Sequence, residues 1–186
     1  KGKFYVKDAY EKLSWCYYLQ GNMEAAENAR KQVLEKGSQS TDADKQAYKD
    51  AKQGKWPNVL LLKVRLLNDG GYNNEALGLL HGKSANDFDK SEEKLEFAYR
   101  VGRIYDDIGH DDDAVKMYLL AIKLGTGRTE YYAARAALQI GWIYERQGKK
   151  EVAIKYYTQC MNMKDHDYKD SLDQKAKAGI ARCEGS

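Results

Sequence analysis

One spacing of small and aromatic residues recurs along this chain and constrains its fold more than any other feature. A small residue is followed at +3 by an aromatic residue, at +7 by glycine, at +12 by alanine and at +16 by a second aromatic residue. The two clearest copies are Gly102, Tyr105, Gly109, Ala114 and Tyr118, and Gly141, Tyr144, Gly148, Ala153 and Tyr157. Weaker copies start at Ser14 and Val64, so that starts at 14, 64, 102 and 141 lie 50, 38 and 39 residues apart. A period of this length predicts a repeat architecture.

The residues around each copy have helical spacing. Apolar and small residues recur at steps of three and four, as in Leu95, Ala98, Val101, Gly102, Tyr105 and Ile108. No sustained alternation of apolar and polar residues indicates a strand. The spacing therefore predicts an all-α chain of helix pairs. The small residue lets two helices approach closely, and glycine supplies the φ > 0 turn between them. Alanine lies where the second helix comes nearest, and the last aromatic residue packs on the next pair. A single pair cannot bury its apolar face, so the copies must stack.

This pattern resembles the tetratricopeptide repeat, most closely in Gly102-Arg103-Ile104-Tyr105 through Ala114 and in Gly141-Trp142-Ile143-Tyr144 through Ala153. The resemblance implies a right-handed superhelix, or α-solenoid, of antiparallel helix-turn-helix repeats. The chain departs from the family in its longer spacing, since the usual repeat has about 34 residues. The family's tryptophan in the first helix is replaced by Tyr10, Leu60, Ala98 and Ala137, and the closing proline is missing.

We expect a single repeat domain over residues 1–186. The expected repeats cover residues 7–36, 57–83, 92–124 and 130–163, and a helix over 171–183 caps the stack. Residues 37–55 form an insertion, in which Asp42 to Gln53 is consistent with a short extra helix. The chain begins at Lys1 without an initiator methionine or a signal segment, so we expect it to be part of a longer protein.

The overall charge and composition exclude several classes of protein. Thirty-one basic and 28 acidic residues give a net charge of +3, which does not support a nucleic-acid-binding surface. No apolar run approaches the roughly 18 residues of a membrane-spanning helix. Cys16, Cys160 and Cys183 are too few and too far apart for a disulfide framework or a zinc site. The compartment and the oligomeric state stay open.

No residue pattern assembles a catalytic, metal or cofactor site. Gly78 to Ser84 resembles a phosphate loop, but three residues instead of four separate its glycines. The carboxylates around Gly109 lack the alternating spacing of a calcium loop. The three histidines, His81, His110 and His166, stand far apart, and no serine nucleophile motif is present. We therefore predict a protein that is not an enzyme and needs no cofactor.

A binding function is expected on the inner face of the first helices. In the family that the chain resembles, this face usually holds an extended peptide or a helix of a partner. Trp, Tyr and Arg are the side chains that most often anchor interfaces. The predicted contact residues are Trp15, Tyr18, Arg65, Tyr99, Arg103, Trp142 and Arg146. Arg65 and Arg103 are expected to pair with acidic groups of a protein or peptide partner. The lysine and asparagine of the family's carboxylate clamp are not present at these positions.

Three classes of function stay open. The first is an interaction scaffold or adaptor. The second is a structural spacer or an oligomerisation region of a larger protein, with Phe4, Tyr5 and Val6 paired between chains. The third is a helical module that binds a small ligand or a glycan through its tyrosines. The aromatic residues at helical spacing also have a simpler interpretation, since such residues usually belong to a core.

Overall fold

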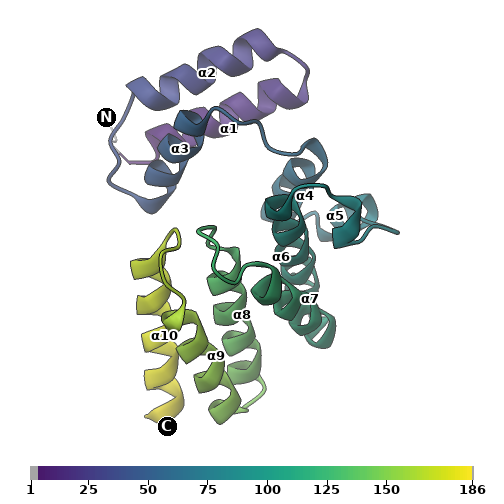
Figure 1. Ribbon diagram of the computed structural model, residues 1–186, viewed down its shortest axis with the longest axis vertical. Coiled ribbons are helices and arrows are strands. Elements are labelled where there is room, and N and C mark those ends of the chain that lie inside the picture. The colour runs from purple at the N-terminus through teal and green to yellow at the C-terminus, as the bar shows by residue number, and fades with distance from the viewer. Residues whose placement is uncertain (1–3, 186) are drawn as a thin grey trace. The chain divides into compact units, whose positions relative to one another are not determined.

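The chain is helical throughout the part that the structure, a computed structural model, describes, which is residues 4–185 (Figure 1). No strand occurs in that range. The helices are α1 (Val6–Leu19), α2 (Met23–Glu35), α3 (Asp42–Gln53), α4 (Val59–Asp69), α5 (Asn73–Leu79), the 3-10 helix η1 (Ala85–Asp87), α6 (Ser91–Asp107), α7 (Asp111–Leu124), α8 (Tyr132–Arg146), α9 (Lys150–Asn162) and α10 (Lys169–Glu184). The prediction of an all-α chain built from helix pairs is confirmed.

The chain divides into two compact units, which we describe separately. Unit 1 comprises residues 1–59 and unit 2 comprises residues 60–186. Unit 1 holds α1, α2 and α3, and unit 2 holds the helices from α4 onward, since only Val59 of α4 lies before the boundary. A single continuous repeat domain over the whole chain stays a prediction. The last helix, expected over residues 171–183, runs from Lys169 to Glu184.

The glycines of the repeated spacing form the turns within the helix pairs. Gly71, Gly109 and Gly148 have φ values of 82°, 80° and 73°, in the left-handed region that a side chain disfavours. The alanines that follow, Ala114 and Ala153, are completely buried. These positions therefore do what the spacing predicts: the chain reverses at glycine, and the second helix approaches the first at alanine.

The small residues of the first helices lie against tyrosine rings of the second helices. A Cβ atom on Gly102 would stand 2.7 Å from Cδ1 of Tyr118, and one on Gly141 would stand 2.5 Å from Cδ1 of Tyr157. The Tyr157 ring also touches Gly179 of α10, where a Cβ would lie 2.5 Å from Cε2. The expectation that the last aromatic residue packs on the next pair was thus incomplete, because the ring first fills the space left by the glycine of its own pair.

Each of these tyrosines also joins a polar bridge to the next repeat. The Tyr118 hydroxyl donates to Asp106 at 3.2 Å, and Nη2 of Arg146 donates to the same carboxylate at 2.9 Å. The Tyr157 hydroxyl bonds in the same way to Glu145, which accepts two hydrogen bonds from Arg182 at 2.6 and 2.8 Å. The ion pair between Asp106 and Arg146 therefore connects α6 to α8. The ion pair between Glu145 and Arg182 connects α8 to α10 in the same way.

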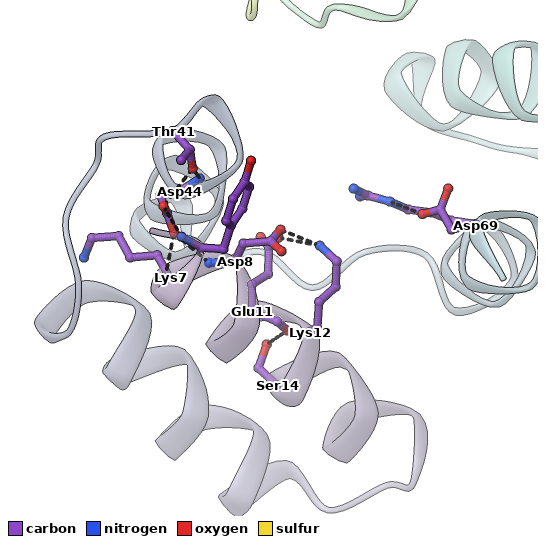
Figure 2. A network of polar contacts seen from close by, with 10 residues as sticks. Lys7, Asp8, Glu11, Lys12, Ser14, Thr41, Asp44 and Asp69 are labelled. Carbon is purple, nitrogen blue, oxygen red and sulfur yellow. Dashed lines mark hydrogen bonds and ion pairs between the residues drawn. The ribbon is translucent and has the colours of Figure 1, made fainter. Parts of the chain in front are cut away.

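Unit 1 is one helix pair closed by α3, the helix of the insertion. Its buried core contains Val33, Ala47 and Ala51, with Tyr10 packed against it. Asp44 of α3 is completely buried and binds the beginning of α1 (Figure 2). Its carboxylate accepts hydrogen bonds from the backbone amides of Tyr5, Lys7 and Asp8 at 2.8, 2.9 and 3.2 Å, and from the Thr41 hydroxyl at 2.7 Å. A carboxylate at this end of a helix satisfies unpaired amides and complements the helix dipole.

Lys7 connects the same corner to the end of α2. Lys7 as a whole is 3% exposed. Its ammonium group donates to the carbonyl oxygens of Val33 at 2.6 Å and Leu34 at 3.3 Å. These carbonyls lie in the last turn of a helix, where a cation is favourable. The Nζ atom also stands 4.9 Å from the centre of the Tyr48 ring in α3. Lys7 and Asp44 thus hold the three helices of unit 1 together.

The Asp44 carboxylate predicts acid-sensitive stability of unit 1. Burial alone would raise the pKa of Asp44, but the hydrogen bonds from Thr41 and from the backbone amides outweigh it, and the pKa is lowered. In the unfolded chain an aspartate has a pKa of about 4, and above that pH the lowered pKa of Asp44 contributes its full stabilisation to the folded state. This contribution is lost as the pH falls from there through the lower pKa that Asp44 has in the folded state. We expect the urea midpoint of unit 1 to drop in that range. A drop of equal size in Asp44→Asn would contradict this assignment.

Candidate partner-binding surface

Three of the predicted contact residues occupy the same repeat position on successive first helices of unit 2. They are Arg65 of α4, Arg103 of α6 and Trp142 of α8. The side chains of Arg65 and Arg103 are 25% and 29% exposed, and Trp142 is half-buried against the core of unit 2. We call these three residues the arginine–tryptophan row. The row combines two cations and one large aromatic ring, and each of the three side chains is partly exposed to solvent.

Each arginine of the row is oriented by a carboxylate one turn later in its own helix. Arg65 lies 3.8 Å from Asp69, and Arg103 lies 3.3 Å from Asp107. Asp107 is shared, because its Oδ2 also accepts a hydrogen bond from Asn68 of α4 at 2.8 Å. Burial opposes the charge of Arg103, but Tyr99 and Asp107 outweigh it and raise its pKa. The guanidinium is therefore a permanent cation.

The row lies beside a tyrosine cluster that the sequence did not reveal as a unit. Its members are Tyr99, Tyr118, Tyr131, Tyr132 and Tyr168. Tyr99 of α6 is 3% exposed, and its ring centre lies 5.1 Å from that of Tyr132 and 6.2 Å from that of Tyr131. The burial of Tyr99 favours packing over direct contact with a partner. The one feature of the sequence that pointed to this cluster is that two of its members, Tyr131 and Tyr132, are adjacent.

The tyrosine cluster holds a buried cation, Arg100, that the sequence did not single out. Arg100 is 4% exposed, and its guanidinium carbon lies 5.6 Å from the ring centres of both Tyr99 and Tyr132. Its Nε donates to Glu96 at 3.2 Å. Burial raises the pKa of Tyr132 well above its ordinary value, and Glu96 raises it further, so the phenol stays neutral. The cluster therefore encloses a buried ion pair between Arg100 and Glu96.

Arg146, another predicted contact residue, has a structural role. Its Nη2 donates to Asp106 at 2.9 Å and to Asp111 at 3.0 Å, and its side chain is 53% exposed. Gln147 donates to the other oxygen of Asp111 at 2.9 Å. These bonds join the end of α8 to the turn between α6 and α7. Two of the carboxylates around Gly109 are thus engaged within the protein.

The two predicted contact residues of unit 1 are engaged in packing. Trp15 is 6% exposed, and the Lys12 ammonium lies 4.3 Å from its ring. Tyr18 stacks on Trp56 with ring centres 4.7 Å apart. The Arg30 guanidinium lies 4.7 Å from the centre of the same indole, whose Nε1 donates to Glu27 at 3.3 Å. Arg30 occupies the repeat position that holds Tyr118 and Tyr157 in unit 2. An arginine therefore replaces the tyrosine of the later repeats at this position.

Candidate metal ligands do not converge in the described residues. No group of three or more His, Cys, Asp or Glu side chains within residues 4–185 is arranged to hold a metal ion. The acidic turn forms a shallow, open depression lined by Gly109, His110, Asp111, Asp112, Asp113 and Gln147. Burial raises the pKa of Cys160 to about 12, with a further contribution from Asp173, so this thiol is not activated.

Comparison with known protein families identifies the helix pairs. The profile of the tetratricopeptide repeat matches residues 95–124 and 134–167, which are the pairs α6–α7 and α8–α9. The chain contains tetratricopeptide repeats. The family assignment made from the repeated spacing is thereby confirmed. No curated protein and no solved structure shows a significant match to the chain.

Tetratricopeptide repeats generally mediate protein–protein interactions, and proteins of this family are typically non-catalytic scaffolds. None of the helices between residues 4 and 185 has the length and apolar character that crossing a bilayer requires. The tetratricopeptide pairs α6–α7 and α8–α9 carry Arg103 and Trp142, two members of the arginine–tryptophan row. The matched repeats thus contain most of the candidate surface.

Proposed function

We propose that the chain is a non-catalytic interaction scaffold, in which the arginine–tryptophan row binds an acidic segment of a protein partner. The observation that carries the proposal is the position of Arg65, Arg103 and Trp142 at one repeat position, each partly exposed. Arginine forks match carboxylates in shape and charge, and tryptophan adds apolar area at little entropic cost.

Binding of an acidic peptide tests this proposal directly. We expect a fluorescein-labelled oligoglutamate peptide to bind the wild-type chain in a salt-dependent manner, and an oligolysine peptide not to bind. Arg103→Glu should weaken oligoglutamate binding about tenfold or more, because it reverses a charge at the centre of the row. Fluorescence anisotropy measures both affinities.

The matched control reverses a charge outside the row. Lys116→Glu on α7 makes the same change in net charge, and the Lys116 side chain is 72% exposed. It should leave binding within about twofold of wild type. An equal loss in both variants would mean that only net charge matters, which contradicts a specific site. If the wild-type chain had no affinity for oligoglutamate, the proposal of an acidic partner would be wrong. If no partner were recovered from a native lysate, the chain would instead be a structural spacer.

A further inference from the structure

The segment that follows α3 is bound by side chains of α1 and α2. Residues 55–58 have no helical structure and lie between the end of α3 and the beginning of α4. Pro57 favours an extended backbone at Trp56, the residue that precedes it. This segment and the two helices that hold it belong to unit 1. The chain thus seats an extended, tryptophan-containing segment on its own first helix pair.

Three groups of different chemistry contact the Trp56 indole. The Tyr18 ring of α1 stacks on it, with ring centres 4.7 Å apart and an angle of 14° between the planes. The Arg30 guanidinium of α2 lies 4.7 Å from the centre of the indole, close enough for a cation–π interaction. The indole Nε1 donates to Oε1 of Glu27 at 3.3 Å. The ring and its one hydrogen-bond donor are therefore both recognised.

The backbone on either side of the indole is bound by two of the same side chains. Nη1 of Arg30 donates to the carbonyl oxygen of Gly54 at 2.8 Å. The Tyr18 hydroxyl donates to the carbonyl oxygen of Pro57 at 3.4 Å. Hydrogen bonds to the backbone are open to any segment that follows the same path. Aromatic side chains that hold a segment next to proline are also a common means of recognising extended peptides.

The acceptor and the cation orient each other. Glu27 and Arg30 lie one turn apart on α2, and Nη2 of Arg30 donates to both carboxylate oxygens of Glu27, at 2.7 and 2.6 Å. Hydrogen bonds between charged groups of this kind are strong. The ion pair therefore holds the guanidinium over the indole and the carboxylate beside its N–H group. We call Tyr18, Glu27 and Arg30 the indole site.

Trp56 occupies the indole site without belonging to the buried core of unit 1. That core contains Val33, Ala47 and Ala51, with Tyr10 packed against it, whereas Trp56 is half-buried. Segments held by partly exposed side chains open locally more easily than core segments do. Release of Trp56 from the indole site therefore leaves the core of unit 1 in place.

From these contacts we infer that the indole site binds a tryptophan–proline segment of a partner protein in exchange for Trp56. The segment seated there defines the chemistry of the partner: an indole, its N–H group and an extended backbone that proline continues. Trp56 is then an internal competitor, whose tether gives it an effective concentration near about 1 mM. It keeps weak ligands out of the site. The indole site shares no residue with the arginine–tryptophan row, so this inference goes beyond the acidic partner.

A fluorescein-labelled peptide with the sequence of residues 53–59 is the probe, and fluorescence anisotropy measures its affinity. Trp56→Ala removes the internal competitor, so we expect the peptide to bind this variant about tenfold or more tightly than the wild-type chain. Trp56→Phe keeps an aromatic ring against Tyr18 but has no N–H group for Glu27, and its affinity should be intermediate. If circular dichroism shows that Trp56→Ala does not fold, Trp56→Phe provides the test.

Two neighbouring cations of α2 supply a matched pair of controls. Added to a folded Trp56 variant, Arg30→Ala should weaken peptide binding about tenfold or more, because it removes the cation over the indole and a backbone hydrogen bond. Lys31→Ala makes the same change in net charge at an exposed position and should leave binding within about twofold. The same peptide with Trp56→Ala should not bind.

Three outcomes would overturn the inference. Equal affinity of the peptide for the wild-type chain and the folded Trp56 variants would show that Trp56 does not occupy the site that the peptide uses. An equal loss with Arg30→Ala and Lys31→Ala would show that charge alone attracts the peptide. A wild-type dimer in sedimentation that Trp56→Ala dissociates would make a second copy of the chain the occupant.

Discussion

Gly141→Ala is expected to lower the free energy of unfolding of unit 2 by about 2 kcal/mol. The added Cβ would stand 2.5 Å from Cδ1 of Tyr157, far inside van der Waals contact. The ring cannot move aside, because Gly179 of α10 lies against its opposite edge, at Cε2 and Cδ2, and the hydroxyl is bound to Glu145. Overpacking of this kind costs about 1–3 kcal/mol or more, which exceeds the gain of up to about 1 kcal/mol from replacing a helical glycine by alanine.

Gly78→Ala is the matched control for that substitution. Gly78 also lies within a helix, α5, but no atom lies within 4 Å of the Cβ that alanine would add. Only the helix-propensity gain of up to about 1 kcal/mol applies, so the two substitutions should shift stability in opposite directions. Urea unfolding followed by circular dichroism measures both. Equal shifts would show that Tyr157 does not occupy the space beside Gly141.

Asp44→Ala is expected to destabilise unit 1 by about 3 kcal/mol. The substitution removes the acceptor of three backbone amides at the beginning of α1 and of the Thr41 hydroxyl. Each hydrogen bond to a charged acceptor contributes about 1.5–3 kcal/mol, and water that reaches the freed amides recovers part of the loss. Lys7, which holds the end of α2 from the same corner, would keep its two carbonyl partners.

Tryptophan fluorescence separates the two units in this measurement. Trp15 and Trp56 lie in unit 1 and Trp142 lies in unit 2, so Trp142→Phe leaves reporters in unit 1 alone. Asp42→Ala, in the first turn of the same helix, removes an ion pair with the exposed Lys45 and should cost less than about 0.5 kcal/mol. If both aspartate variants unfolded at the wild-type urea midpoint, the central role of Asp44 would be wrong.

Local chemistry explains what was predicted correctly from the sequence. The left-handed turns at Gly109 and Gly148 require glycine, whatever surrounds them. The helix over Asp42–Gln53 has its N-cap in Thr41, its C-cap in Gly54 and no interrupting residue, so its bounds are visible in the sequence. The close approach at Gly102 was equally visible, because only a small residue fits between two helices.

The sequence did not predict which of the candidate contact residues are buried. Trp15 and Tyr99 share the repeat stripe with Arg65, Arg103 and Trp142, yet they are 6% and 3% exposed. Residues of one stripe differ in exposure because different side chains from neighbouring helices cover them. Tyr99 is covered by Tyr131 and Tyr132, which come from the next repeat. The sequence predicts the stripe, and packing between repeats decides which of its members stay accessible.

The sequence by itself determined that this chain forms helix pairs of the tetratricopeptide kind, because helical periodicity, turn glycines and small contact residues act over a few positions. Tertiary structure alone decided which distant groups meet. Asp44 reaches the amide of Lys7, and Arg182 reaches Glu145, each across 37 positions of the chain. Such pairings depend on how whole helices pack and on which rotamers that packing allows, and neither is encoded in local spacing.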